Sequence, residues 1–152
     1  MAARLLVVYH SHGWRTAAMA EAVAAGAREA VGVEVILKRA LQADLDDLLA
    51  AQAYLFGTPE TFGSLSGALK DFFERTYYPA QGRTQGRAYA SFVCAGNDGS
   101  GAIQAIQRIA RGYGWKEVQP ALLARSETVE ASLPACRELG ATLAHGLALG
   151  VY

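Results

Sequence analysis

One stretch near the amino terminus sets the class of the fold: LLVVYHSHGWRTAAMAEAVAAGA, residues 5–27. Its first five residues, Leu5 to Tyr9, form a continuous apolar run, which is typical of a strand buried on both faces. From Thr16 the period changes to that of a helix, because Met19, Val23 and Ala27 recur on one face. A strand followed through a short loop by a helix predicts the first unit of a parallel α/β sheet.

The same alternation continues along the rest of the chain. Further strands are predicted at 33–37, 53–56, 88–95 and between Trp115 and Ala124. Further helices are predicted over 44–48 and 64–76, around 103–110 with an end at Gly112 or Gly114, and from about Ser132 with Pro134 in the first turn. Five strands and about five helices predict one α/β domain over residues 1–152, a three-layer sandwich whose five-stranded parallel sheet has right-handed crossovers.

Composition and charge exclude several classes of protein. The chain has 152 residues, 52% of them hydrophobic and 18% charged, which excludes disorder. Fourteen basic residues balance fourteen acidic ones, so no electrostatic signature of binding to nucleic acid or to an anionic membrane is present. Cys94 and Cys136 lie in apolar stretches and are expected to be reduced and buried. With no apolar run of membrane-span or signal-peptide length, we expect a soluble cytoplasmic protein.

Parallel sheets of this kind bind ligands at the carboxyl ends of their strands, and the loop after the first strand has the features of a phosphate site. It reads Ser11-His12-Gly13-Trp14-Arg15-Thr16 and leads directly into a helix, whose first amides are free to bind an anion. Neither the dinucleotide nor the nucleoside-triphosphate fingerprint is present, so a monophosphate is expected. The alternative is an ordinary turn with Thr16 near the helix cap. His10 and His12 lack cysteine or carboxylate partners at ligand spacing, so no metal site is expected.

Two further loops follow the third and fourth strands. The first, residues 57–64, is long for a connection to a helix and places Phe62 in a polar, glycine-rich setting. Phe62 is expected to flank a planar ligand, although a role as core filler remains open. The second, residues 96–101, contains three glycines, which permit close backbone approach to a ligand. Its alternative is a tight turn in which Ser100 caps the following helix.

These loops together carry a family resemblance. Residues 7–11 with Thr16 and 19–23 resemble the phosphate loop and first helix of the flavodoxin-like flavoproteins, most closely the short NAD(P)H-dependent FMN or quinone reductases. Residues 56–63 with 66–72 are similar to the loop that packs against the flavin ring in those reductases. Residues 95–101 resemble the loop on the other side of the ring. One departure is that flavodoxin phosphate loops commonly read [ST]-x-T-G-x-T, whereas here Trp14 stands where glycine is usual and Gly13 precedes it.

The resemblance implies a sheet in the order 2-1-3-4-5 and a non-covalently bound FMN. Its phosphate would be bound by Ser11, His12, Gly13, Trp14, Arg15 and Thr16. Its ring would be held by Thr58, Pro59, Glu60, Thr61, Phe62 and Gly63 on one side, and by Ala95, Gly96, Asn97, Asp98, Gly99 and Gly101 on the other. Electrons would pass from NAD(P)H to a small-molecule acceptor such as a quinone or a free flavin, with no catalytic side chain required.

Three other functions agree less well with the sequence. The resemblance also covers flavodoxins that carry electrons without turnover; these are strongly acidic, so the net charge of zero favours a reductase. The chain lacks the acidic residues that a phosphate-accepting receiver domain needs after its first and third strands. It also lacks the nucleophile motif of hydrolases, because Ser64 and Ser66 both miss the central position of G-x-S-x-G.

The segment 77–87 is the predicted substrate contact. Exposed aromatic residues near the expected flavin suggest a homo-oligomer, while the acceptor and the choice between NADH and NADPH stay open.

Overall fold

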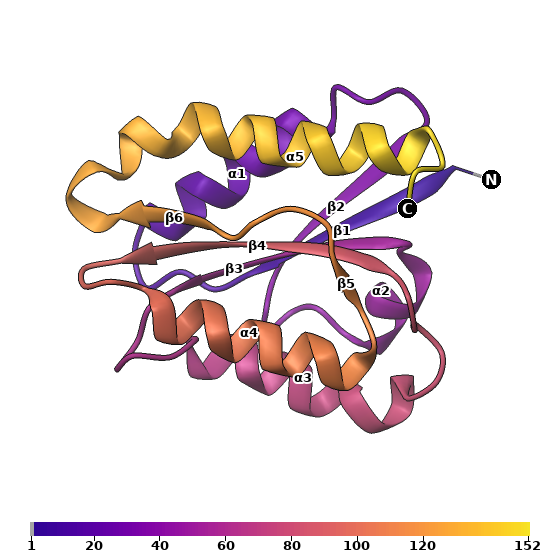
Figure 1. Cartoon of the computed structure of the whole chain (residues 1–152), viewed down its shortest axis with the longest axis horizontal. Helices are drawn as coiled ribbons and strands as arrows, with labels where there is room; N and C mark the ends of the chain where they lie inside the picture. The colour runs from indigo at the N-terminus through magenta and orange to yellow at the C-terminus, as the bar shows by residue number, and fades with distance from the viewer. Residues whose placement is uncertain (1) are drawn as a thin grey trace.

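The computed structural model describes residues 2–152 and contains one sheet with helices on both faces (Figure 1). Its strands are β1 (Ala3–Tyr9), β2 (Val33–Arg39), β3 (Ala53–Pro59), β4 (Ala88–Ala95), β5 (Lys116–Glu117) and β6 (Leu122–Arg125). Its helices are α1 (Arg15–Ala27), α2 (Leu45–Ala50), α3 (Gly67–Ala80), α4 (Ser100–Tyr113) and α5 (Leu133–Ala148), with a 3-10 segment, η1, at Ser126–Ser132.

The sheet has the predicted order, β2-β1-β3-β4-β5, and all its pairs are parallel. The fifth position differs from the prediction because two short strands share it. β5 pairs with Ala88 and Tyr89 at the start of β4, and β6 pairs with the end of β4 from Phe92 to Ala95. Pro120 lies in the interruption, and proline has no amide hydrogen to donate to a strand ladder.

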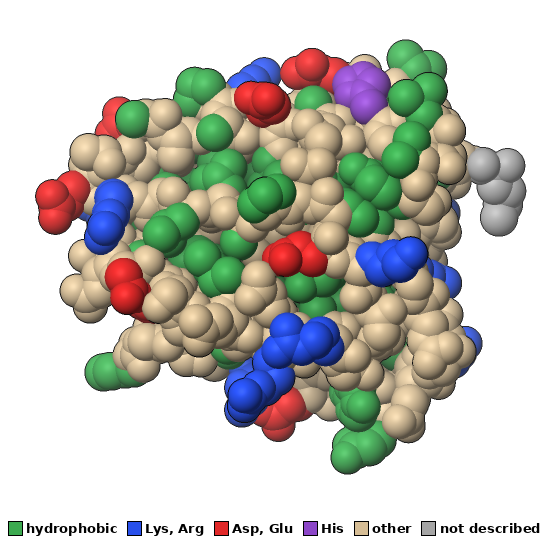
Figure 2. Space-filling model, viewed as in Figure 1, with side chains coloured by type: hydrophobic (Ala, Val, Ile, Leu, Met, Phe, Trp, Pro, Cys, Tyr) green, Lys and Arg blue, Asp and Glu red, His purple; other side chains and the backbone are tan. Residues whose placement is uncertain are grey.

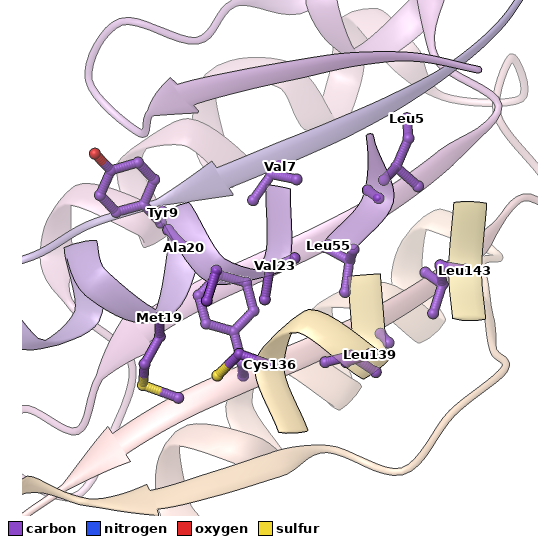
Figure 3. Close-up of a cluster of buried hydrophobic side chains, with 14 of the residues drawn as sticks. Leu5, Val7, Tyr9, Met19, Ala20, Val23, Leu55, Cys136, Leu139 and Leu143 are labelled. Carbon is purple, nitrogen blue, oxygen red and sulfur yellow. The ribbon is translucent and has the colours of Figure 1, made fainter. Parts of the chain in front are cut away.

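The helices form two layers around this sheet (Figure 1). α1 and α5 cover one face, and α2, α3 and α4 cover the other. Figure 3 shows the core on the α1–α5 side, where Val7 and Leu55 from the sheet lie near Val23 and Leu143 from the helices. The two helices approach closely, since a Cβ atom on Gly140 would overlap the carbonyl oxygen of Val23. The small residues therefore serve close helix packing.

The core on the other face is aromatic. Phe56 from β3 stacks on Trp115 with ring centroids 5.3 Å apart, and Trp115 stacks on Tyr113 at 4.1 Å. The Trp115 indole donates a hydrogen bond of 2.9 Å to the Thr84 hydroxyl, which satisfies its buried N–H. Burial raises the pKa of Tyr113 to about 12. This core holds α3 and α4 against the sheet from their first turns, where Leu69 and Ala102 are buried, and so fixes the helix starts that border the site.

Helix α3 begins and ends later than predicted. Ser66 caps it by accepting a hydrogen bond from the Leu69 amide at 3.3 Å, and the helix continues through Tyr77 to Ala80. The loop that follows leads into the amino end of β4, at the opposite end of the sheet from the loops after β1, β3 and β4 (Figure 1). The segment 77–87 therefore lies at the other edge of the sheet from these three loops, and its role as a substrate contact stays a prediction.

Other boundaries resolve open alternatives. Helix α4 ends at Gly114, whose φ of +81° closes the helix in the left-handed conformation. Pro134 lies in the first turn of α5, as predicted.

Cys94 and Cys136 are both free and buried. Within residues 2–152, no helix combines the length and the apolar character that a bilayer crossing requires.

Candidate functional site

The loop between β1 and α1 is organised by one buried hydroxyl. The Ser11 hydroxyl donates to the Gly13 carbonyl oxygen at 2.7 Å and accepts from the Ala17 amide at 3.1 Å. The residue at the helix cap itself is Trp14, which forms no side-chain cap. The expectation that Thr16 lies near the cap is correct for its position, because Thr16 is in the first turn, but the capping oxygen comes from Ser11. The earlier amides of that turn have no partner within the helix and lie at the positive end of its dipole.

A cavity of about 150 Å³ lies against this loop. It is lined by the six predicted phosphate-loop residues and by Pro59, Cys94 and Ser126. The cavity therefore joins the carboxyl ends of β1, β3 and β4 to the start of the 3-10 segment η1. Its volume is roughly five times the ~30 Å³ that a water molecule occupies in the liquid, so it has room for a small anion.

Arg15 connects this cavity to η1. Its Nε donates a hydrogen bond of 2.9 Å to the Ser126 carbonyl oxygen, and its guanidinium carbon lies 5.1 Å from the centroid of the half-exposed Trp14 ring. Arg15 thus holds the loop against the chain after β6 while contributing positive charge to the cavity wall. Sequence analysis missed Ser126, although polar residues directly after the last strand are a signal, since all the strands end at one edge.

The loop between β3 and α3 is a tight hairpin. Thr61 and Ser64 exchange two backbone hydrogen bonds of 2.8 and 2.9 Å, and the two residues between them, Phe62 and Gly63, have φ of +49° and +73°. Positive φ at both central positions defines a type I′ turn. Phe62 is fully exposed, which excludes the alternative that it fills the core. A bulky residue in this conformation costs on the order of 1–3 kcal/mol, and the two hydrogen bonds between Thr61 and Ser64 hold Phe62 in it beside the strand ends.

Two predicted residues of the same loop hold the backbone. The buried Thr58 hydroxyl accepts a hydrogen bond from the Ser66 amide at 2.9 Å and donates to the Pro59 carbonyl oxygen at 2.8 Å. The Glu60 amide extends the pairing of β3 with β4 by donating to the Cys94 carbonyl oxygen at 2.9 Å. These contacts fix the base of the hairpin at the end of the sheet.

The loop between β4 and α4 contacts the hairpin directly. Gly99 occupies the helix cap with φ of +74°, and a Cβ atom on Gly101 would overlap the Gly63 carbonyl oxygen. The alternative in which Ser100 caps α4 is not what the structure has: the amide and hydroxyl of Ser100 both donate to the Asp98 carboxylate at 3.0 Å. These two hydrogen bonds lower the pKa of Asp98. Glycine at both contact points lets the two loops pack by backbone alone.

A second cavity, of about 310 Å³, adjoins the first. It is lined by Ala95, Gly96, Arg125, Ser126, Glu127 and Thr128, so the end of β4 forms one wall and the chain after β6 the other. The Arg125 guanidinium donates a hydrogen bond to the Asn97 carbonyl oxygen and thereby connects the end of β6 to the loop before α4. Sequence analysis missed Arg125, Glu127 and Thr128 because it did not locate the end of the last strand.

Two histidines link the first loop to the hairpin. His10 Nε2 lies 3.3 Å from His12 Nδ1, and His12 Nε2 lies 3.3 Å from the Thr61 hydroxyl. Burial, followed by the charges of His12 and Arg39, lowers the pKa of His10. Among residues 2–152, no group of three or more histidine, cysteine or carboxylate side chains is arranged to hold a metal ion.

Comparisons with known proteins point in one direction. The family model described as NADPH-dependent FMN reductase matches residues 37–128. A flavodoxin of Aquifex aeolicus is 30% identical over 97% of this chain and 89% of its own length. An NAD(P)H dehydrogenase (quinone) of Acidithiobacillus ferrooxidans is 34% identical over 59% of this chain and 56% of its own length. The alignment thus spans only about half of that dehydrogenase.

Solved structures agree on the fold. An archaeal flavodoxin superposes with a TM-score of 0.77 at 27% identity, covering 93% of this chain and 96% of that one. A WrbA-like flavodoxin from Agrobacterium tumefaciens gives a TM-score of 0.77 at 28% identity, covering 94% and 96% of the two chains. The parallel sheet in the order 2-1-3-4-5 with helices on both faces is the arrangement of these flavodoxins.

Proposed function

The chain belongs to the NADPH-dependent FMN reductase family, and from this membership we propose that it binds FMN non-covalently and passes electrons from NAD(P)H to a small acceptor such as a quinone or a free flavin. The observation that carries the proposal is the meeting of three loops at the carboxyl edge of the sheet. The hairpin that exposes an aromatic ring meets the glycine-rich loop at Gly63 and Gly101, and His12 links the loop with free helix amides to the hairpin through Thr61.

The residues present fit the parts of FMN. The cavity of about 150 Å³ offers first-turn amides of α1, hydroxyls and the Arg15 charge to a phosphate group. Phe62 offers an exposed apolar face, and the loop from Gly96 to Gly101 offers backbone without side-chain bulk. A planar ring attached to a phosphate matches this combination of one anion site and two flat surfaces.

FMN, when bound, supplies the acceptance and donation of electrons, and the chain supplies position and surroundings. The β1–α1 loop fixes one end of the ligand, because Ser11 holds its backbone through two hydrogen bonds. The hairpin and the Gly96–Gly101 loop orient the other end. The apolar strand ends behind them, including the buried Cys94, keep water from the inner side.

Two measurements test this proposal. Apo-protein is titrated with FMN, and the quenching of flavin fluorescence gives a Kd; riboflavin, which lacks the phosphate, serves as the control ligand. The loaded protein is then mixed with NADH or NADPH and a soluble quinone, and the loss of nicotinamide absorbance is followed. We expect FMN to bind more tightly than riboflavin and turnover to require the quinone. A protein that binds neither flavin contradicts the proposal.

The alternative proposal is an electron carrier without turnover of its own. It is supported by the flavodoxin of Aquifex aeolicus, which aligns over nearly the whole chain. The charge favours the reductase, because fourteen basic residues balance fourteen acidic ones and Figure 2 shows both signs distributed over one face. A carrier docks by a field of one sign. FMN binding without any NAD(P)H oxidation, combined with rapid electron exchange after chemical reduction, supports the carrier.

We also propose self-association near the site. Trp14 and Phe62 are exposed aromatic residues on neighbouring loops, and exposed apolar surface of this kind marks interaction sites. Light scattering during gel filtration, with and without FMN, measures the mass of the particle. A monomer at all concentrations and ligand states contradicts the proposal.

A further inference from the structure

A chain of side-chain contacts runs from the end of β1 to the hairpin. His10 approaches His12 edge to face, with ring centroids 4.8 Å apart and an Nε2–Nδ1 distance of 3.3 Å. His12 Nε2 then lies 3.3 Å from the Thr61 hydroxyl, the first residue of the type I′ turn. His12 therefore contacts the segment that presents Phe62.

The same His12 ring lines the cavity of about 150 Å³. The His12 side chain thus borders the cavity proposed for the phosphate and also contacts the hairpin proposed to hold the flavin ring. Since both contacts belong to one imidazole, a change of its charge or orientation at the cavity is felt at Thr61.

The two contacts form a continuous relay that needs no charged ring. When His10 Nε2 donates to His12 Nδ1, the proton of His12 lies on Nε2, which then donates to the Thr61 hydroxyl. The charged groups nearby are Arg39 at the end of β2 and Arg15 at the start of α1. Among residues 2–152, no carboxylate forms an ion pair with either histidine.

A phosphate group in the cavity would lie against the same imidazole ring that contacts the Thr61 hydroxyl. Its oxygens accept hydrogen bonds, so binding would fix the orientation of the His12 ring and with it the contact to Thr61. We propose that occupation of the cavity by a phosphate group is transmitted through His12 to Thr61 and orders the Phe62 hairpin. This rests on the proposed function, because it takes the cavity to be the site of the FMN phosphate.

The coupling has a consequence for ligand selection. A flavin without phosphate would lose the phosphate contacts and also the ordering of the hairpin that should hold its ring. By linkage, a ring held at the hairpin would in turn tighten the phosphate site by the same factor. Couplings of this kind typically change affinity by roughly 5- to 150-fold.

The test uses inorganic phosphate and the apo-protein, so that no flavin is needed. Amide resonances are followed by NMR during a phosphate titration at pH 6.5, with Gly13 to Thr16 reporting the cavity and Phe62 to Ser64 reporting the hairpin. We expect both groups of signals to shift with one midpoint. Thr61→Val removes the hydroxyl at nearly constant volume, and His12→Gln removes the imidazole ring that joins the cavity to the hairpin. His145→Gln, an exposed histidine on α5, is the matched control.

In Thr61→Val and His12→Gln, the cavity signals should still shift and the hairpin signals should not, whereas His145→Gln should behave as wild type. Thr61→Ser should restore the hairpin response. Hairpin shifts that persist in both Thr61→Val and His12→Gln overturn the coupling while leaving the phosphate site intact. Absence of any shift at Gly13 to Thr16 in wild type contradicts the phosphate site and the coupling together.

Discussion

Gly101 at the start of α4 and Gly63 at the tip of the β3–α3 hairpin touch through their backbones, with no room for a side chain between them. The contact joins two loops that are 38 positions apart in the sequence and that follow neighbouring strands. Because the hairpin also exposes Phe62, this contact sets how the Phe62 ring stands relative to the loop from Gly96 to Gly101. Four predictions follow from this contact and from the other contacts of the site.

Gly101→Ala should weaken FMN binding by about tenfold or more. The new Cβ overlaps the Gly63 carbonyl oxygen, so the hairpin must move, and overpacking of this kind typically costs about 1–3 kcal/mol. Fluorescence titration with FMN measures the effect. Gly67→Ala is the control, because a Cβ there meets open space at the start of α3. Equal FMN affinity in the Gly101 variant and wild type contradicts the role of this contact in placing the hairpin for the flavin.

Phe62→Ala should lower FMN affinity by roughly 2- to 12-fold, the range that corresponds to an aromatic contact of about 0.5–1.5 kcal/mol. Its ring is fully exposed and packs on nothing in the fold, so the melting temperature should hardly change. Tyr78→Ala is the control, since Tyr78 is an exposed aromatic residue at the far end of α3. A loss of affinity shared by both variants indicates a general effect of exposed rings and counts against the role of Phe62.

Ser11→Ala should reduce both stability and FMN affinity. It removes the hydrogen bonds that join the loop to Gly13 and Ala17, and loss of a helix-capping oxygen typically costs about 1 kcal/mol. Asp44→Ala removes the corresponding cap of α2, which lies away from the site. Urea unfolding should show similar losses in the two variants, but only Ser11→Ala should weaken FMN. If Asp44→Ala weakens FMN equally, the effect arises from global stability.

The stability of the apo-protein should fall as the pH drops below about 6.5. The pKa of His10 is lowered in the folded state from its ordinary value of 6.5, so the unfolded chain takes up a proton before the folded one does. The free energy of unfolding therefore decreases with falling pH between 6.5 and the lowered value. Urea unfolding at pH 7.5 and 5.5 measures the change, and His10→Gln should flatten it. His145→Gln should retain the wild-type dependence, and an unchanged slope in His10→Gln would show that another group is responsible.

The local sequence pattern was sufficient to predict the strands, the helices and their order along the chain. Runs such as Leu5 to Tyr9 and Ala88 to Ala95 predicted buried strands, because a strand covered on both faces is mostly apolar along its length. The three loops were predicted from glycine, hydroxyl and helix-start residues, and the parallel topology brings them to one edge of the sheet. Where a strand was weakly patterned, as between Trp115 and Ala124, the sequence did not show that it would be divided in two.

The contacts that shape the site were decided by the tertiary structure. Ser126 and Arg125 reach the cavities because β6 ends beside β4, and His12 meets Thr61 although 49 positions separate them. The positive φ of Phe62 follows from the hairpin closed by Thr61 and Ser64, whereas the sequence showed only that Phe62 lies in a long, polar and glycine-rich loop. The sequence by itself determined the order of the elements and the edge at which a ligand would bind, since periodicity and burial act over neighbouring residues. The tertiary structure determined which side chains meet there, because each of these contacts joins residues that are far apart in the sequence and local patterns describe only neighbouring residues.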